Sequence, residues 1–502
     1  MSLYSFMRTY RDKTDTTAVI YETHKIGFGA FFREIDRVAA GLYKLGVRRG
    51  DTVILALPNI PQSVVATYAL SRLGAIASMV HPKLSADEFA AVVESQKPKA
   101  VFLSDVNLRV FYKRKGNAKC VLCHFGLYDY LGLPHAKYFE AYEGDGEDTM
   151  FYMQSGGTSG YPKTIALSSR AVNAMAGNLL HFLDDKFNEN DAMFAGLPMF
   201  HGFGLCVGMH ASLCTNMPIV LVPVFNAKKV VKIIEKQRIT TMVAVPRMIS
   251  KLLLQDGFAN EKVRSIKNVF VGGDFVGEDL IRAFDERMKE GGGEGKLYPG
   301  YGLSETCGVC VVTKEGRAEN SVGKPIDGLK IKIVDECMRE CAFGETGELL
   351  VCGEQVMSGY FDDESATNDA FCIIDGEKWL KTGDLFRADE DGNLFFMGRK
   401  KRLIKISGIN VFPTEIERVA KELPYVNECV CIEYYEHNKP YIKLVVEGEL
   451  TTDEKKKIIA HIAKRMSHWN VPREVECQAV FPRTKIGKIN LLEMTNEHSK
   501  NR

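Results

Sequence analysis

A short polar loop carries the first residues that could do chemistry. Residues 154–163 read QSGGTSGYPK, with three glycines, three Ser or Thr hydroxyls and a closing lysine. Glycine permits positive φ and lets backbone N–H groups approach a ligand closely. Successive N–H groups in such a turn bind phosphate oxygens. The run lacks the G-x-x-x-x-G-K-[ST] spacing of a P-loop, and alone it fits a phosphate-binding loop and an ordinary polar loop equally well.

Four further stretches place aromatic, hydroxyl and charged side chains close together. They read PGYGLSET (299–306), KTGD (381–384), GRKKRLIKISG (398–408) and FPRTKIGK (481–488). Each has an ordinary explanation when taken alone. The basic run fits a solvated face or a nucleic-acid patch, Glu305 fits an acidic residue at a helix N-terminus, and Lys488 fits a surface lysine.

The cysteines raise a separate question about metal binding. There are thirteen, and two C-x-x-C pairs stand out, Cys120 with Cys123 and Cys307 with Cys310. The first pair is followed by His124, as in haem attachment, and the two pairs together could bind zinc. An odd number of cysteines in a long chain without a recognisable secretion signal favours reduced, buried thiols instead.

Bulk properties exclude some classes of function. The formal net charge is +1 over 502 residues, so any polyanion must be held by a local site. The most apolar helical stretch, residues 64–77, is interrupted by Arg72 and Gly74, and a membrane span needs about 20 apolar residues. We expect a cytoplasmic monomer or homodimer with no integral membrane segment and no nucleic-acid partner.

The elements that position these residues follow from hydrophobic periodicity. Helical patterns (31–44, 61–73, 171–184, 228–237, 247–255) alternate with strand patterns (52–57, 192–197, 241–244, 268–271), which predicts mainly parallel sheets covered by helices. Short strand-like runs at 330–334, 347–352 and 394–397 predict a small β-rich subdomain over about 323–398. Helical patterns at 416–423 and 454–466, with strand patterns at 426–434 and 441–446, predict a compact α+β domain over 399–502.

The five stretches, in this order and at these separations, resemble the core motifs of the adenylate-forming superfamily. This group includes acyl-CoA synthetases, adenylation domains of peptide synthetases, and luciferases. The resemblance runs from about Asp51 to Lys488 and so covers nearly the whole chain. It implies an α/β fold whose large N-terminal AMP-binding domain (1–398) holds two parallel-type α/β sheets and the β-rich subdomain. A small mobile α+β domain (399–502) would follow, with Lys401 as its hinge.

The resemblance also implies how ATP and Mg²⁺ would bind. Ser304 would contact the α-phosphate, Glu305 would hold Mg²⁺, and Lys488 would reach the α-phosphate and the carboxylate of the acid. Tyr301 would stack on adenine, and Asp384 would accept the ribose hydroxyls with help from Arg399. The other implied nucleotide-binding residues are Ser155, Gly156, Gly157, Thr158, Ser159, Gly160, Lys163, Gly273, Asp274 and Gly302. Asp274 replaces the small residue usual in the family, which puts its role in doubt.

The acid and the acceptor are implied by two further segments. LPMFHGFGL (197–205) is similar to the family segment beside the acyl pocket, with the implied residues His201, Gly202, Phe203, Gly272 and Gly300. His201 would also border the thiol channel and act in catalysis, although it fits a packed loop histidine too. Amino-acid-activating relatives usually carry an Asp in this region, and none occurs between residues 191 and 226. We therefore expect a carboxylic acid without an α-amino group, first a medium- or long-chain fatty acid and second an aryl acid.

Ser407 and Gly408 match the loop that lines the pantetheine tunnel in CoA ligases. Because acyl carrier proteins carry the same pantetheine arm, CoA and a carrier protein both stay open as acceptors. The resemblance implies an ATP-dependent carboxylate–CoA ligase. A non-catalytic nucleotide or acyl binder is the contrasting hypothesis, and the presence of Glu305, Asp384, Arg399 and Lys488 argues against it.

Overall fold

The computed structural model describes residues 1–10, 16–124, 130–155, 163–184, 187, 190–215, 217–314, 316–406, 409–436, 439–483 and 489–498. The chain divides into two compact units. Unit 1 comprises residues 1–155, 162–331 and 351–380, and unit 2 comprises residues 156–161, 332–350 and 381–502.

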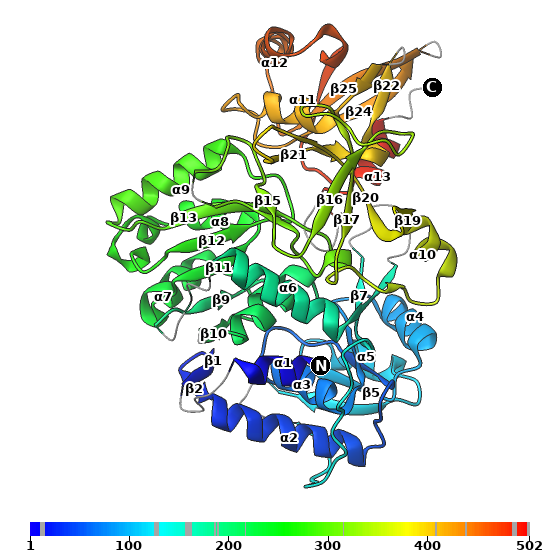
Figure 1. Ribbon diagram of the computed structural model, residues 1–502. Helices are drawn as coiled ribbons and strands as arrows, with labels where there is room; N and C mark the ends of the chain where they lie inside the picture. The colour runs from blue at the N-terminus through cyan, green and yellow to red at the C-terminus, as the bar shows by residue number, and fades with distance from the viewer. Residues whose placement is uncertain are drawn as a thin grey trace. The chain divides into compact units, whose positions relative to one another are not determined.

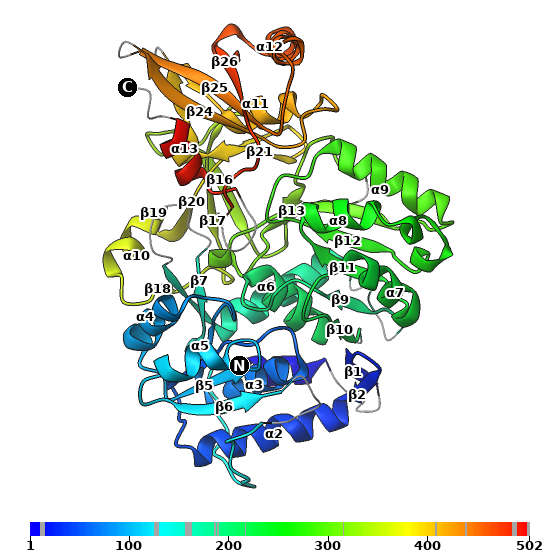
Figure 2. The same ribbon diagram turned by 180° about the vertical axis from the view of Figure 1, so that it is seen from behind.

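A seven-stranded sheet forms the first half of unit 1. Its order is β18-β8-β7-β4-β3-β5-β6, with β7, β4, β3, β5 and β6 parallel and the hairpin β7–β8 antiparallel. Gln154 pairs with Thr164 across this hairpin, at the base of the polar loop. Helices α4 (Ala86–Gln96) and α5 (Leu108–Phe111) lie beside β5 and β6 (Figure 2). The strands are β3 (Thr52–Leu55), β4 (Ile76–Met79), β5 (Ala100–Ser104), β6 (Lys119–Cys123), β7 (Thr149–Gln154), β8 (Thr164–Ser168) and β18 (Gly359–Tyr360).

Helix α3 (Pro61–Leu73) is the apolar helix that the sequence predicts as a core element rather than a membrane span. Proline occupies its first turn, and Gly74 ends it in the left-handed conformation at φ 64°. All its residues except Arg72 are buried, and it contacts α2 (Phe28–Lys44). In the part of the chain that the structure describes, no helix is long and apolar enough to cross a membrane.

A nine-stranded sheet forms the second half of unit 1 (Figure 1). Its order is β15-β14-β13-β12-β11-β9-β10-β1-β2, parallel in the middle and antiparallel at both ends. The predicted strands 241–244 and 268–271 are confirmed residue for residue as β11 and β12. The strands are β1 (Thr17–Tyr21), β2 (His24–Gly27), β9 (Met193–Ala195), β10 (Ile219–Leu221), β11 (Thr241–Ala244), β12 (Asn268–Val271), β13 (Lys296–Tyr301), β14 (Val311–Val312) and β15 (Lys324–Pro325). The helices are α1 (Leu3–Thr9), α6 (Ser169–Phe182), α7 (Ala227–Gln237), α8 (Pro246–Leu253) and α9 (Glu278–Glu290).

A π-helix, η2 (Phe203–Ala211), packs against α6, β9 and β11. It is nine residues long, whereas π-helices usually occur as single-turn bulges, often at functional sites. Gly204 is required by close packing, since a Cβ there would lie 2.2 Å from the Pro198 carbonyl oxygen. The glycine-rich sequence gave no helical prediction for this segment.

One face of the nine-stranded sheet carries the residues that matter most below. Val243, Phe270 and Tyr298 are direct neighbours on β11, β12 and β13, so their side chains share a face. Gly272 and Gly300 lie two residues further along and return to that same face. Helix η2 covers it, because a Cβ on Gly208 would lie 3.1 Å from Cγ2 of Val243.

Unit 2 holds strands of the β-rich subdomain and the C-terminal α+β fold. The subdomain sheet has the order β16-β17-β20-β19, with β21 beside β20, and the division between the units falls inside β16, β17 and β20. The subdomain contains β16 (Lys330–Val334), β17 (Gly347–Cys352), α10 (Glu364–Ala370), β19 (Phe371–Ile374), β20 (Glu377–Ala388) and β21 (Leu394–Arg399), and of these α10 and β19 belong to unit 1.

The C-terminal fold packs α11 (Pro413–Ala420) and α12 (Thr452–Arg465) against a three-stranded sheet (Figure 2). The predicted apolar face of α12 is confirmed, since Ile458 and Ile462 are fully buried. The remaining elements are β22 (Ile404–Ile406), β23 (Ile409–Val411), β24 (Cys429–Glu436), β25 (Lys439–Glu447), β26 (Glu474–Gln478) and α13 (Leu491–His498). The predicted fold class is confirmed, whereas the boundary at 398 and the hinge at Lys401 stay predictions.

Candidate active site

Three charged or polar side chains of unit 1 form a small cluster. The Tyr360 hydroxyl donates to Oε1 of Glu305 at 3.1 Å, and Nζ of Lys163 lies 4.7 Å from the centroid of the Tyr360 ring. Strand β18 pairs with β8 and sets Tyr360 opposite Ile165, two residues beyond Lys163. Burial raises the pKa of the Tyr360 phenol, and the neighbouring Glu305 carboxylate raises it further. The hydroxyl therefore stays protonated and acts as the donor.

Glu305 is held through its backbone as well. It belongs to the short 3₁₀-helix η5 (Ser304–Thr306), which begins where the Thr306 hydroxyl accepts from the Leu303 N–H. The backbone carbonyl of Glu305 accepts a hydrogen bond from the Met357 N–H at 2.8 Å. Glu305 and Ser304 are both partly exposed. Mg²⁺ in proteins is usually held by one or two carboxylates together with substrate phosphates, so a partly exposed, oriented carboxylate fits this ion by its donor chemistry.

The polar loop is closed at its base. Ser155 N donates to the Lys163 carbonyl at 2.8 Å, and Lys163 N donates to the Ser155 hydroxyl at 2.9 Å. These two bonds extend the β7–β8 hairpin and bring the ends of the loop together. The predicted phosphate-binding residues Gly156, Gly157, Thr158, Ser159 and Gly160 lie outside the described residues.

Backbone segments cross closely beside η5, and glycine makes the crossing possible. Gly308 has φ +94°, and a Cβ there would lie 2.6 Å from the Gly202 carbonyl carbon. A Cβ on Gly302 would lie 2.4 Å from the Gly308 carbonyl oxygen. Gly202, Gly302 and Gly308 therefore form a three-glycine crossing that has no room for a side chain at Gly302 or Gly308 and little room at Gly202, where a Cβ would lie 3.3 Å from the Gly308 backbone.

The ends of β12 and β13 carry the residues predicted to contact adenine and the acyl group. Gly273 has φ +81° and is exposed, so its backbone is open to a ligand. A Cβ on Gly272 would lie 3.0 Å from the Gly300 carbonyl oxygen and 3.9 Å from the Phe203 ring. Tyr301, the last residue of β13, is partly exposed. The exposed Asp274 uses Oδ1 to accept from Phe275 N, and nothing in the structure assigns it a further role.

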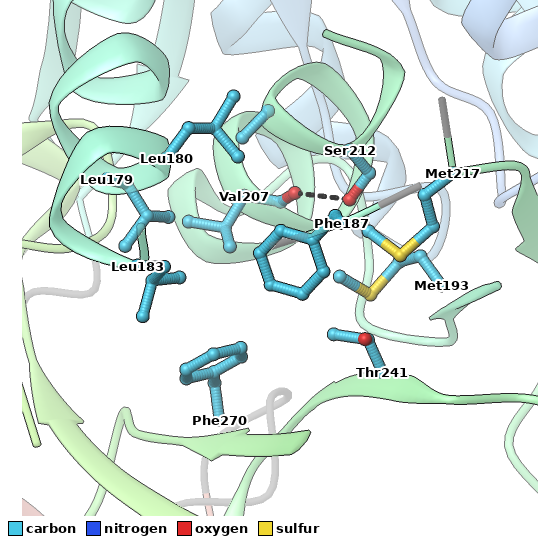
Figure 3. Close-up of a pocket in the computed structure, with 11 residues that line it drawn as sticks. Leu179, Leu180, Leu183, Phe187, Met193, Val207, Ser212, Met217, Thr241 and Phe270 are labelled. Carbon is cyan, nitrogen blue, oxygen red and sulfur yellow. Dashed lines mark hydrogen bonds between the residues drawn. The ribbon is translucent and has the colours of Figure 1, made fainter. Parts of the chain in front are cut away.

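A small apolar cavity of about 20 Å³ lies between η2, α6 and the sheet face that carries Phe270 (Figure 3). Phe270 and Thr241 form its floor on β12 and β11, and the Leu183 side chain points toward Phe270 from the end of α6 (Figure 3). Among the lining residues the polar side chains are hydroxyls only, and Ser212 donates its proton to the Val207 carbonyl. The lining residues are Leu179, Leu180, Leu183, Phe187, Met193, Val207, Ala211, Ser212, Met217, Thr241 and Phe270.

This pocket lies on the same sheet face as the predicted acyl residues. Phe270 precedes Gly272 by two residues on β12, and Thr241 precedes Val243 by two on β11. Thr241 pairs with Asn268, which precedes Gly272 by four residues. At about 3.3 Å per residue, Gly272 lies about 13 Å along the strand direction from the Thr241–Asn268 pair. Gly272 and Gly300 could be identified from the sequence. The cavity could not, because its lining residues come from several separated segments of the chain.

His201 and His210 have different surroundings. His201 is partly exposed, with its ring centroid 4.7 Å from that of Phe200. His210 is fully buried within η2, where the Tyr68 hydroxyl meets Nδ1 and the Asn173 Oδ1 meets Nε2, each at 3.0 Å. Burial lowers the pKa of His210 to about 3, so the ring is neutral. Since Asn173 Oδ1 only accepts, Nε2 carries the proton and Nδ1 accepts from Tyr68.

The cysteines are free thiols. All thirteen lie within the described residues, and none forms a disulfide. Burial raises the pKa of the Cys307, Cys429 and Cys431 thiols, which lowers their reactivity because the thiolate is the nucleophile. Within the ranges that the structure describes, no group of three or more His, Cys, Asp and Glu side chains could hold a metal ion.

Unit 2 carries the predicted ribose-binding residues. Asp384 and Arg399 are direct cross-strand neighbours on β20 and β21, with Arg399 Nε 3.6 Å from Asp384 Oδ1. The Asp384 side chain is only 2% exposed, while Arg399 is 47% exposed. The turn before Asp384 is fixed by the Thr382 hydroxyl, which donates to the Leu349 carbonyl at 2.8 Å. Lys401 is exposed in a short 3₁₀-helix, and Ser407, Gly408 and Lys488 lie outside the described residues.

Comparison with known proteins places the chain in a family. A profile of the AMP-binding enzyme family matches residues 6–361, and a profile of the AMP-binding enzyme C-terminal domain matches residues 415–488. A probable CoA ligase of Humulus lupulus is 28% identical over 483 residues, which cover 92% of this chain and 86% of the relative. Indoleacetate–CoA ligase of Aromatoleum aromaticum is 26% identical, covering 94% of this chain and 93% of the relative.

Among solved structures, O-succinylbenzoate CoA synthetase from Bacillus subtilis in complex with ATP and magnesium ion aligns with a TM-score of 0.84. It is 26% identical and covers all of both chains, at 100% each. The first family profile alone spans well over half of the chain. This chain therefore belongs to the AMP-binding family of adenylate-forming enzymes.

Proposed function

We propose that this chain is an ATP-dependent carboxylate–CoA ligase. In the first step a carboxylate oxygen of the acid attacks the α-phosphorus of ATP, forming an acyl-adenylate and releasing pyrophosphate. In the second step the CoA thiol attacks the activated carbonyl, forming a thioester and releasing AMP. Family membership supports the first step, and the curated relatives named as CoA ligases support the second.

The observation that carries the proposal is the cluster of Glu305, Tyr360 and Lys163. Attack of a carboxylate on a phosphate brings two anions together, so fixed positive charge and a metal ion are needed to offset repulsion. Glu305, oriented by the Tyr360 hydroxyl, would hold Mg²⁺, which neutralises phosphate charge when bound. Lys163, with its ammonium over the Tyr360 ring, would contact the leaving pyrophosphate.

The other predicted residues keep their roles as part of this proposal. Tyr301 would stack on adenine, with the backbone of Gly273 beside it, and Ser304 would contact the α-phosphate. Asp384 would accept the ribose hydroxyls, and its near-complete burial beside Arg399 limits its side chain to a narrow range of positions. Lys488 would reach the reacting carboxylate and α-phosphate, with Lys401 as the hinge of the small domain. Ser407 and Gly408 would line the path of the pantetheine thiol.

The acid is proposed to carry an apolar group. Apart from the hydroxyls of Ser212 and Thr241, the small cavity beside Phe270 is lined by aliphatic, aromatic and thioether side chains, and none of its lining residues is a carboxylate that could pair with an ammonium. Its volume is about 20 Å³, so an acyl group would enter only with movement of these side chains. A medium- or long-chain fatty acid is the first expectation. An aryl acid is the second, supported by the similarity to an indoleacetate–CoA ligase and an O-succinylbenzoate CoA synthetase.

An acid-dependent pyrophosphate-release screen tests this function. Fatty, aryl and short polar acids are each supplied with ATP and Mg²⁺, with and without CoA, and thioester and AMP are measured. Release with apolar acids, and thioester only when CoA is present, is the expected result. No release with any acid would refute the ligase and leave a nucleotide or acyl binder. Release without a CoA thioester would redirect the second step to an acyl carrier protein.

A further inference from the structure

Glu348 is a buried carboxylate in unit 2. It lies on β17, and its side chain is 8% exposed. Burying a carboxylate is unfavourable unless its oxygens are paired and hydrogen-bonded. Both oxygens have partners here, since Oε1 accepts from the backbone N–H of Gly383 at 3.1 Å and Oε2 lies 2.6 Å from Nζ of Lys400.

The first partner belongs to the turn that presents Asp384. Gly383 directly precedes Asp384 and has φ +70°, a conformation that favours glycine. The same turn is bound a second time by β17, through the Thr382 hydroxyl and the Leu349 carbonyl. Its own Asp384 N donates to the Thr382 hydroxyl at 3.1 Å. The position of the Asp384 carboxylate along its strand therefore depends on two adjacent residues of β17.

The second partner belongs to the segment around the proposed hinge. Lys400 stands between Arg399, the cross-strand neighbour of Asp384, and Lys401. The Lys400 side chain is 49% exposed and could extend fully into water, yet it turns to the buried Glu348 oxygen. One carboxylate thus holds the residue before the ribose-binding acid and the residue before the hinge.

An exposed ion pair in the same unit provides a contrast. Nζ of Lys405 lies 2.8 Å from Oε1 of Glu336, close to the 2.6 Å of the Lys400–Glu348 pair, but Glu336 is 70% exposed and accepts no backbone bond from the Asp384 turn. Exposed pairs of this kind contribute little to stability or order. Both pairs join a lysine to a glutamate. Only the Glu348 carboxylate is buried, and only Glu348 also accepts a hydrogen bond from the Gly383 backbone.

We propose that Glu348 is a positioning residue that fixes the Asp384 turn and the start of the hinge to one strand. Its bond to Gly383 sets the ribose-binding carboxylate, and its bond to Lys400 anchors the chain directly before Lys401. The roles of Asp384 and Lys401 rest on the proposed adenylation function. Because Glu348 acts through two neighbours, its removal affects nucleotide binding and acyl transfer, whereas removal of Lys400 affects acyl transfer alone.

The test compares Glu348→Ala, Glu348→Gln and Lys400→Met with the matched control Glu336→Gln. Glu348→Ala removes both contacts, and we expect KM for ATP in pyrophosphate release to rise at least about tenfold while kcat changes less. Glu348→Gln keeps an acceptor for Gly383 and loses the charge that pairs with Lys400. We expect Glu348→Gln and Lys400→Met to slow single-turnover thioester formation relative to adenylation by about fivefold, with KM for ATP close to the control.

The outcomes separate the inference from the function on which it rests. Thermal melting shows whether Glu348→Ala folds. If it does not, the inference is tested with Glu348→Gln and Lys400→Met, by the ratio of the rate of thioester formation to the rate of adenylation. The positioning role is overturned if this ratio equals that of the unsubstituted protein in both Glu348→Gln and Lys400→Met. It is also overturned if folded Glu348→Ala has the same KM for ATP as the unsubstituted protein. If the parental protein releases no pyrophosphate with any acid, ATP affinity is measured by calorimetry instead. A weaker affinity in Glu348→Ala then supports the link to Gly383, and an unchanged affinity overturns it.

Discussion

Replacing Tyr360 by Phe isolates one hydrogen bond at the proposed magnesium residue. The substitution removes the hydroxyl that donates to Glu305 Oε1 and keeps the ring beneath the Lys163 ammonium. Hydrogen bonds to charged groups contribute about 1.5–3 kcal/mol. The O···O distance of 3.1 Å is longer than the roughly 2.5–2.7 Å of the strongest bonds of this kind, and Tyr360 is half-buried, so the lower end applies. A loss of about 1.5 kcal/mol corresponds to about a tenfold change in affinity.

We expect this loss in the magnesium dependence of the reaction. Pyrophosphate release is measured against Mg²⁺ concentration at saturating ATP, and the half-saturating Mg²⁺ concentration should rise about tenfold, with a smaller change in kcat. Tyr434→Phe is the matched control, because Nζ of Lys443 likewise lies over that ring, at 4.9 Å from its centroid, and neither residue is assigned to Mg²⁺. A Tyr360→Phe enzyme whose magnesium dependence equals that of the control would refute the link between this hydroxyl and the metal.

Four further outcomes follow from the site and the core. Lys488→Ala should abolish adenylate formation and still form thioester from a supplied acyl-adenylate, and normal pyrophosphate release would contradict its role. Gly408→Leu should leave pyrophosphate release intact and block thioester formation, and equal loss of both steps would show that it does not line the thiol path. Phe270→Leu should raise kcat/KM for a bulkier acid relative to a smaller one by about tenfold, and an unchanged ratio would place the acyl group elsewhere. Burial lowers the pKa of His210 to about 3 in the folded state, whereas the unfolded value is about 6.5. Between these two pH values the unfolded state binds a proton that the folded state does not. The free energy of unfolding is therefore highest above about pH 6.5 and decreases as the pH falls toward 3. Urea unfolding measures how steeply the free energy of unfolding changes with pH in this range. His210→Gln should reduce that slope by up to about 1.4 kcal/mol per pH unit, and an identical slope in both proteins would contradict the buried neutral ring.

The strands and the amphipathic helices could be predicted because their signals are local. β11 and β12 consist largely of β-branched and apolar residues, each is preceded by a polar residue, and their predicted ranges agree with the structure. The start of α3 at Pro61 and its end at Gly74 follow from the conformational limits of those two residues. The fold class followed from the alternation of such elements.

The π-helix and the pocket beside it could not be predicted, because tertiary packing decides them. Gly204 and Gly208 disfavour any helix on local propensity, yet the close approach to the Pro198 backbone requires glycine at 204, and Val243 leaves little room for a side chain at 208. The pairing of Tyr360 with Glu305 joins residues 55 apart in sequence through the β18–β8 contact. Glu348 gave no signal either, since a carboxylate in a strand pattern is ordinarily taken as solvent-facing. The role of each predicted site residue stays a prediction until the variants are measured.

The three-glycine crossing has a consequence for redesign of this enzyme. A Cβ at residue 302 or 308 would overlap backbone atoms that have no side-chain freedom to move aside, and glycine 202 is held against residue 308. A mutagenesis library directed at the acyl specificity would yield few folded variants at residues 302 and 308. Leu179, Leu183 and Met217 line the small cavity with their side chains, so substitutions there change its shape. If this cavity holds the acyl group, as proposed, new substrates would be reached by substituting these lining residues while Gly302 and Gly308 are kept.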